Sequence, residues 1–169
     1  ATGGQPIAEL GLAAGLKGDT SCGLIVNRMF ETSAPDVYAC GDVSSFEDPT
    51  FGFNWNAQHH LHAKWSGTAA GKNMAGANEP YEKITYFWSD FFDQHMILRG
   101  SPVGLTQSKT LGETVSGNFI ELWSGGDGTL RMGLAMNHEE PKLDPISDKL
   151  EELIRDRAQI ETITESAFA

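Results

Sequence analysis

The sequence is poor in features that would each point to a particular class of protein. It has no apolar run long enough for a transmembrane helix and no basic and apolar leader at its start. Its 12 basic residues are outnumbered by 23 acidic ones, which gives a net charge of −11. Nucleic acid and anionic membranes both require a positive surface, which this composition does not supply. We therefore expect a soluble, folded protein that does not bind nucleic acid and does not span a membrane.

Cysteine is also scarce. Cys22 and Cys40 are too few for a disulfide framework, and their spacing forms neither a C-x-x-C redox pair nor a zinc site. This scarcity favours a reducing compartment, with the cytoplasm as the first expectation and the mitochondrion as the alternative. We expect Cys40 to be a small core residue. The acidic surface is typical of proteins that stay soluble by charge, but it would also suit a basic partner.

The sequence contains no G-x-G-x-x-G turn, which is the element that presents a helix N-terminus to a dinucleotide pyrophosphate. It begins at Ala1 without a preceding element, so we expect a fragment. Short apolar runs at 23–26 and 37–40 predict buried parallel strands. A parallel sheet needs more strands than these two. We therefore expect its edge to pair with a missing N-terminal part of the same protein or with another chain, a homodimer being one such arrangement.

A helical pattern follows the two predicted strands. The spacing of apolar and small residues predicts a helix from about 54 to 77, and Pro80 lies just beyond its end. The segment 67–72 within it mimics a phosphate-binding loop, but it is one residue short and lacks the Ser or Thr that must follow the lysine. We interpret it as helix packing. A boundary at Pro80 predicts two domains, 1–80 and 81–169.

The second predicted domain contains strands followed by a helix. The glycines and the aspartate of 124–128 predict a tight antiparallel hairpin turn. Asp144 and Pro145 predict the N-cap and first turn of a helix that packs on the sheet by its apolar stripe. The expected strands are 95–99, 118–123 and 129–136. This order predicts an α+β domain with a three-stranded antiparallel sheet and one helix.

The most informative stretch is Thr32-Ser-Ala-Pro-Asp-Val-Tyr-Ala-Cys-Gly-Asp42. In it, an apolar strand is expected to end at Gly41 and Asp42, just before a glycine-rich and aromatic loop and a helix. A carboxylate at the carboxyl end of such a strand can accept hydrogen bonds from the hydroxyls of a polyol, and the preceding glycine lets a ligand approach the backbone. The alternative for Asp42 is a turn or helix-cap residue, which Gly-Asp alone would favour.

The complete stretch resembles the second flavin-binding motif of FAD-dependent pyridine nucleotide oxidoreductases. The resemblance extends from Gly3-Gly-Gln-Pro6 to Phe87-Trp-Ser-Asp90, and with His59-His-Leu-His-Ala63 it is most similar to the ferredoxin-reductase and apoptosis-inducing-factor branch. It implies that the chain is the C-terminal part of such a protein. The implied fold is an α/β remnant of an FAD-binding and NAD(P)-binding domain at 1–80, followed by the reductase C-terminal, or interface, domain at 81–169.

The resemblance also implies FAD as cofactor and NAD(P)H as substrate, with electrons passing to a redox protein or a small acceptor. It implies that Asp42 holds the ribityl chain, and that Trp88 lies beside the flavin, although a core position is the alternative for a tryptophan. The residues implied for FAD are Gly41, Asp42, His59, His60 and Trp88, and those implied for NAD are Gly3, Gln58, His59 and Trp88.

His59 and His62 share one face of the predicted helix, which raises a metal site as an alternative. His60 diverges from His59 by about 100° on a helix, and no acidic or thiol ligand accompanies them, so we expect no metal. The absence of a paired-cysteine centre favours electron transfer by flavin alone. A second hypothesis is a non-catalytic remnant or interface module without cofactor, which the missing glycine turn favours for the isolated chain.

Overall fold

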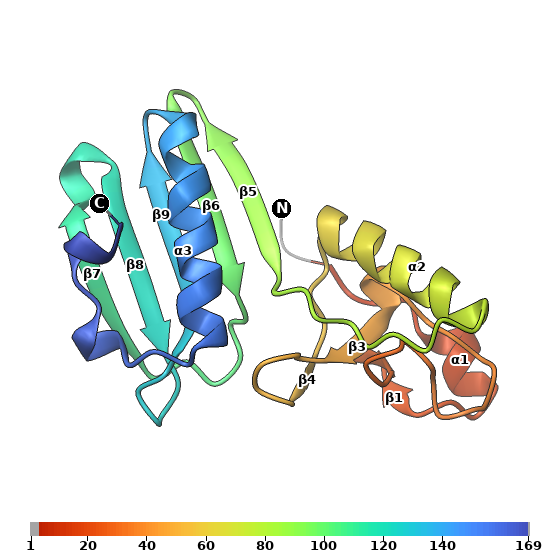
Figure 1. Ribbon diagram of the computed structural model, residues 1–169. Helices are drawn as coiled ribbons and strands as arrows, with labels where there is room; N and C mark the ends of the chain where they lie inside the picture. The colour runs from red at the N-terminus through yellow and green to blue at the C-terminus, as the bar shows by residue number, and fades with distance from the viewer. Residues whose placement is uncertain (1–3, 169) are drawn as a thin grey trace. The chain divides into compact units, whose positions relative to one another are not determined.

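The computed structural model describes residues 4–168, and the chain divides into two compact units, Ala1–Lys83 and Ile84–Ala169 (Figure 1). Each unit has its own sheet and is described by itself. Among residues 4–168, no helix is long and apolar enough to cross a membrane. The longest helix, α2, has 15 residues. Gly3 lies outside the described residues.

The first unit is built on a small mixed sheet of order β1-β2-β3-β4. β2 and β3 are parallel, and the two outer pairs are antiparallel. The parallel pair is the arrangement expected of an α/β sheet, and the predicted strand at 23–26 is confirmed as β2. The elements of this unit are α1 (Glu9–Ala13), β1 (Gly18–Asp19), β2 (Gly23–Ile25), β3 (Ser44–Glu47), β4 (Asn54–Trp55) and α2 (His60–Met74).

The strand predicted at 37–40 is wrong. The chain reverses near Asp36, whose φ is +62°, so that the segment folds back on its own predecessor instead of joining the sheet. The Ala39 amide donates to the Phe30 carbonyl at 3.0 Å, and Glu31 forms an isolated antiparallel bridge with Tyr38. The parallel partner of β2 is β3, which begins after Asp42 rather than before it. In this segment Ala39 is buried but Cys40 is exposed, so the expectation of a core cysteine is also wrong.

An aromatic cluster forms the core of the first unit. Phe46 on β3 stacks on the imidazole of His62 with ring centroids 4.3 Å apart, and Tyr81 meets Phe46 edge-on at 5.8 Å. Phe30 and Trp55 complete the cluster, and all five side chains are buried. Burying large aromatic rings contributes strongly to stability, so this cluster fixes α2 on the sheet.

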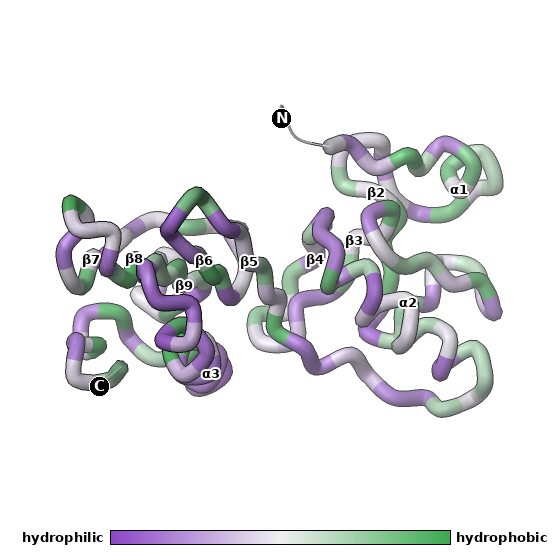
Figure 2. The backbone as a smooth tube through the Cα atoms, turned by 90° about the horizontal axis from the view of Figure 1, so that it is seen from above, coloured by the Kyte–Doolittle hydropathy of each residue, from purple (hydrophilic) through white to green (hydrophobic). Residues whose placement is uncertain are grey.

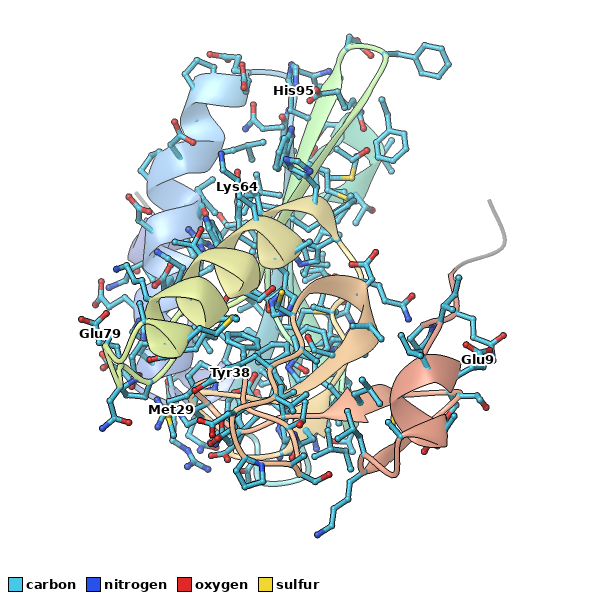
Figure 3. All side chains as sticks on the ribbon, turned by 90° about the vertical axis from the view of Figure 1, so that its right-hand side faces the viewer. Glu9, Met29, Tyr38, Lys64, Glu79 and His95 are labelled. Carbon is cyan, nitrogen blue, oxygen red and sulfur yellow. The ribbon has the colours of Figure 1, made fainter. Side chains whose placement is uncertain are left out.

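The helix α2 is shorter than predicted, because residues 54 and 55 form β4 instead of a first helical turn. Trp55 pairs with Phe46 across the sheet, and the chain becomes helical only after His59. At the other end Gly76, with φ +89°, follows Met74 as a C-terminal glycine, as is common at helix ends. In Figure 3, α2 can be followed from Lys64, on the helix, to Glu79, beyond its end.

The second unit is a five-stranded antiparallel sheet of order β5-β6-β9-β8-β7, with helix α3 on one face (Figure 2). Gly133 on β9 and Leu150 on α3 lie so close that a Cβ added at Gly133 would come within 2.4 Å of the Leu150 side chain. The elements of this unit are β5 (Tyr86–Phe91), β6 (Gln94–Gly100), β7 (Gln107–Glu113), β8 (Asn118–Ser124), β9 (Leu130–Asn137) and α3 (Leu143–Arg155).

The prediction of three strands is corrected to five. The three expected strands are present as β6, β8 and β9, and the hairpin turn between β8 and β9 is confirmed. The two strands that were not predicted, β5 and β7, are the edges of the sheet. An edge strand needs to bury little of its surface: in β7, Leu111 is its one buried residue. Its sequence therefore lacks the apolar alternation that identifies a strand.

The closing helix α3 is present, but its predicted start is wrong. It begins at Leu143 after a short 3₁₀ turn, so Asp144 and Pro145 lie inside its first turn, and Asp144 is not the N-cap. An acidic residue and a proline are both favourable there, because the first-turn amides have no intrahelical acceptor. Leu150 and Ile154 are buried against the sheet, as the apolar stripe predicts.

The segment after α3 covers the outer edge of β7. The ammonium of Lys109 on β7 donates to the carbonyl oxygens of Ile160, Glu161 and Ile163 at 3.3, 3.0 and 2.7 Å. The Gly112 amide donates to the Glu165 carboxylate at 3.1 Å. The bond to Glu165 occupies a backbone amide that an edge strand would otherwise leave for pairing, and the bonds from Lys109 hold the segment beside the strand.

Candidate functional site

Asp42 lies in a 3₁₀ turn, Gly41–Val43, immediately before β3. Gly41 has φ +73°, a left-handed conformation that glycine adopts without steric cost. The turn brings the Asp42 side chain to the surface, where it is exposed. The carboxylate thus precedes a strand rather than following one, but it stands on a glycine turn and faces outward, as a group that accepts hydrogen bonds from a ligand must.

The turn is held from the side of α2 and from the side of β4. The Gly41 amide donates to Ser66 Oγ at 2.9 Å, and Ser66 is fully buried on α2. Asn56 Nδ2, from the segment after β4, donates to the Asp42 carbonyl at 2.8 Å. A Cβ built on Gly41 would lie 3.6 Å from that of Ala63, so the helix packs directly against the turn. These contacts fix the position of the backbone that carries the Asp42 carboxylate.

His59 caps the amino end of α2 and interacts with Asp42. Its backbone is extended, with φ −150° and ψ 159°, and its Nδ1 accepts from the His62 amide at 3.4 Å. Partial burial lowers the pKa of His59, and the nearby Asp42 carboxylate opposes this by favouring the charged imidazole. The structure therefore brings together the two predicted site residues, a neutral imidazole and an exposed carboxylate.

Gln58 and His60 flank His59 at the amino end of the helix. Gln58 is half-buried with φ +46°, and His60 is the exposed first residue of α2. A Cβ at Gly4 would lie 3.2 Å from Gln58 Oε1, so the described part of the N-terminal segment passes against this side chain. The predicted residues Gly41, Asp42, Gln58, His59 and His60 all belong to the first unit.

Trp88 belongs to the second unit, on the edge strand β5. Its side chain is 47% exposed, so it is not a core residue of that unit. Its ring stacks on Tyr86 with centroids 6.1 Å apart and planes 19° apart, and the guanidinium of Arg99 lies 4.4 Å above the Tyr86 ring. A partly exposed indole held flat by a neighbour is suited to stacking on a planar ligand.

His62 has a structural position instead. It is fully buried, and its Nδ1 lies 3.5 Å from the Tyr81 hydroxyl. Burial lowers its pKa to about 4, with a smaller effect from His59, so the imidazole is neutral near pH 7. Within residues 4–168, no group of three or more histidine, cysteine, aspartate or glutamate side chains is placed to hold a metal ion.

Asn56 and Ser66 support the site but are not predicted from the sequence. Asn56 reaches backbone carbonyls 12 and 14 residues away, and Ser66 reaches an amide 25 residues away. Side chains that bind distant backbone leave no periodic pattern or spacing in the sequence, so only the tertiary structure identifies them.

No family model matches the chain. It is 29% identical over 133 residues to the ferredoxin–NAD(+) reductase component of the anthranilate 1,2-dioxygenase system of Burkholderia cepacia, covering 78% of this chain and 32% of that protein. It is 37% identical over 70 residues to apoptosis-inducing factor 1, mitochondrial, of Dictyostelium discoideum, covering 40% and 13%. The chain thus spans a third or less of the length of these curated relatives.

The fold has close counterparts among solved structures. A FAD-dependent pyridine nucleotide-disulphide oxidoreductase from Desulfovibrio vulgaris superposes with a TM-score of 0.79 at 18% identity, over 96% of this chain and 43% of that one. At this identity the likeness concerns the fold alone. The sequence matches confirm the resemblance to the ferredoxin-reductase and apoptosis-inducing-factor groups, and the FAD-dependent pyridine nucleotide-disulphide oxidoreductase shares the fold.

Proposed function

We propose that this chain contributes part of the flavin site of an NAD(P)H-dependent FAD oxidoreductase. The observation that carries the proposal is the exposed Asp42 carboxylate on its glycine turn, beside the imidazole of His59 at the amino end of α2. The site residues fit the cofactor by their chemistry. A carboxylate accepts hydrogen bonds from ribityl hydroxyls, and the glycine leaves the backbone accessible to a ligand.

The residues that would hold FAD are Gly41, Asp42, His59, His60 and Trp88. Gly3, Gln58, His59 and Trp88 would contact the nicotinamide. Bound FAD supplies the redox chemistry, since a flavin can take up hydride from NAD(P)H and release electrons to an acceptor. The protein's part is to bind and orient: Asp42 holds the sugar-alcohol chain, while His59 and Trp88 present polar and flat apolar surfaces.

We further propose that residues 1–80 close the FAD-binding and NAD(P)-binding domain and that 81–169 form the C-terminal domain of the reductase. A ferredoxin-like redox protein is the acceptor class that the Burkholderia cepacia relative's name supports. The Dictyostelium discoideum relative's name supports a mitochondrial location, and the scarcity of cysteine agrees with the cytoplasm as well.

The test is to measure flavin in the complete protein, as its source organism makes it. We expect the purified protein to show flavin absorbance, and we expect Asp42→Ala to weaken FAD binding at least tenfold, because a charge-assisted hydrogen bond contributes about 1.5–3 kcal/mol. Asp36→Asn is the control for loss of a surface carboxylate, since Asp36 is also an exposed aspartate of the first unit but lies outside the Gly41–Val43 turn, and asparagine tolerates its φ of +62°. Equal FAD affinity of the Asp42→Ala and unaltered proteins would contradict the proposal.

The second candidate is a non-catalytic interface module that keeps the fold without the cofactor. The absence of a G-x-G-x-x-G turn from these 169 residues favours it. A complete protein that is colourless and binds no added FAD would support this candidate against the first.

A further inference from the structure

Asn56 lies between β4 and α2, and its amide is directed at the turn that carries Asp42. Nδ2 donates to the carbonyl oxygen of Asp42 at 2.8 Å and to that of Ser44 at 2.9 Å. These two carbonyls lie two residues apart, on either side of Val43. One side chain therefore fixes the backbone at Asp42 and at the beginning of β3.

The partners of the Asn56 side chain determine which of its two amide atoms, Nδ2 or Oδ1, faces the turn. The reverse orientation would place the amide oxygen against two carbonyl oxygens, which cannot donate. As it stands, Asn56 Oδ1 is buried and has no hydrogen-bond partner among residues 4–168. An unpaired buried acceptor costs free energy. The two hydrogen bonds that Nδ2 donates offset this cost and hold the side chain in place.

The turn depends on side chains for most of its polar contacts. The Gly41 amide is bound by Ser66 Oγ, and the Gly41 carbonyl accepts from Ser44 Oγ at 2.8 Å. Gly41 is also the residue with the greatest backbone freedom in the segment. If the bonds from Asn56 were removed, the backbone on both sides of Val43 would be less constrained, and the Asp42 carboxylate, which this backbone carries, would be less fixed in position.

Resting on the proposed function, we propose that Asn56 is a positioning residue for the flavin site. It does not contact the cofactor. It holds the backbone of Asp42 so that the carboxylate faces the position of the ribityl hydroxyls, and a displaced carboxylate would have to be reordered at the expense of binding free energy.

Asn54 provides a matched control within the same strand region. Its Nδ2 also donates to two backbone carbonyls, those of Val26 at 3.3 Å and Ser45 at 3.1 Å. The chemistry is the same, but neither carbonyl belongs to the Asp42 turn. The two asparagines therefore separate loss of stability from loss of positioning.

The experiment measures FAD affinity by quenching of flavin fluorescence in the complete protein, with thermal unfolding in parallel. We expect Asn56→Ala to weaken binding about tenfold, and Asn54→Ala to lower the unfolding temperature similarly while leaving FAD affinity unchanged. The decisive measurement is a double-mutant cycle: in an Asp42→Ala background, Asn56→Ala should cause no further loss of affinity, because its effect acts through that carboxylate.

Additive losses in the cycle, or equal loss of affinity in Asn54→Ala, would overturn the positioning role while leaving the proposed function intact. Absence of FAD binding by the unaltered protein would instead overturn the proposed function and this role with it. If Asn56→Ala does not fold, Asn56→Gln takes its place in the cycle, because it keeps the amide but displaces it by one methylene. The criterion is unchanged: a loss of affinity that disappears in the Asp42→Ala background supports the positioning role, and an additive loss contradicts it.

Discussion

The imidazole of His62, buried between Phe46 and Tyr81, makes the stability of the first unit depend on pH. Its pKa is about 4 in the folded chain, against about 6.5 in an unfolded one. Above pH 6.5 neither state takes up a proton, and the full stability is present. As the pH falls from 6.5 towards 4, the unfolded chain binds a proton that the folded chain does not, so unfolding becomes easier.

We expect the free energy of unfolding to fall by about 2 kcal/mol between pH 7.5 and pH 5 because of this residue. His62→Phe keeps an aromatic ring on Phe46 but cannot be protonated, so its stability should fall less over the same range. Urea denaturation followed by tryptophan fluorescence at the two pH values measures this. His60→Phe, at an exposed site, is the control and should keep the pH dependence of the unaltered protein.

At the residue scale, the sequence points to a side chain where a run of neighbouring residues resembles a known motif, and the roles that the resemblance implies for those residues stay predictions. The resemblance points to Asp42 and His59, and in the structure the Asp42 carboxylate is near enough to favour the charged form of His59, against the effect of burial on its pKa. Asn56 could not be identified, since its partners lie on another segment. For His62 the sequence predicts only that it binds no metal. Its position at the centre of the core depends on the packing of Phe46 and Tyr81, which the sequence does not reveal.

Among the elements, the packing of α3 on the second sheet depends on the absence of a side chain at Gly133. A Cβ there would lie 2.4 Å from Leu150 Cδ2, well inside van der Waals contact. We expect Gly133→Ala to destabilise the protein by about 1–3 kcal/mol through overpacking, measured by chemical denaturation.

Two variants test the cause of that loss. Gly126→Ala is the control, because nothing lies within 4 Å of a Cβ at Gly126, and it should change stability little. Leu150→Ala makes room, so the double variant with Gly133→Ala should lose less stability than the sum of the two single losses. A strictly additive loss would show that the helix is not the obstacle.

Helices and strands could be predicted where burial of one face makes apolar residues recur at a regular spacing in the sequence. β8, β9 and α3 are buried on one face, and their apolar alternation or stripe identified them. The edge strands β5 and β7 carry no such pattern, because few of their side chains are buried on either face of the sheet. The run at 37–40 was predicted wrongly because its apolar residues do not reveal that Asp36 reverses the chain there.

For the whole molecule, the separation into two units at Lys83 and Ile84 predicts independent folding. In the second unit, all five strands pair with strands of the same unit, and α3 covers one face of their sheet. The buried residues of this core therefore come from the second unit itself. We expect residues 84–169, produced alone, to show a single cooperative unfolding transition by circular dichroism and dispersed amide resonances in an NMR spectrum. A gradual transition with strong binding of a hydrophobic dye would contradict this expectation.

The covering of β7 by the segment after α3 limits how molecules of this kind could associate. Lys109 and the Gly112 amide of β7 bind the segment after α3 along that border, whereas β5, at the other border of the sheet, pairs with β6 alone among residues 84–168. Growth of a fibril requires that every added molecule expose two pairing borders. Because one border of this sheet is covered, the sheet lacks one of the two borders that such growth needs, and we expect the segment after α3 to disfavour edge-to-edge association.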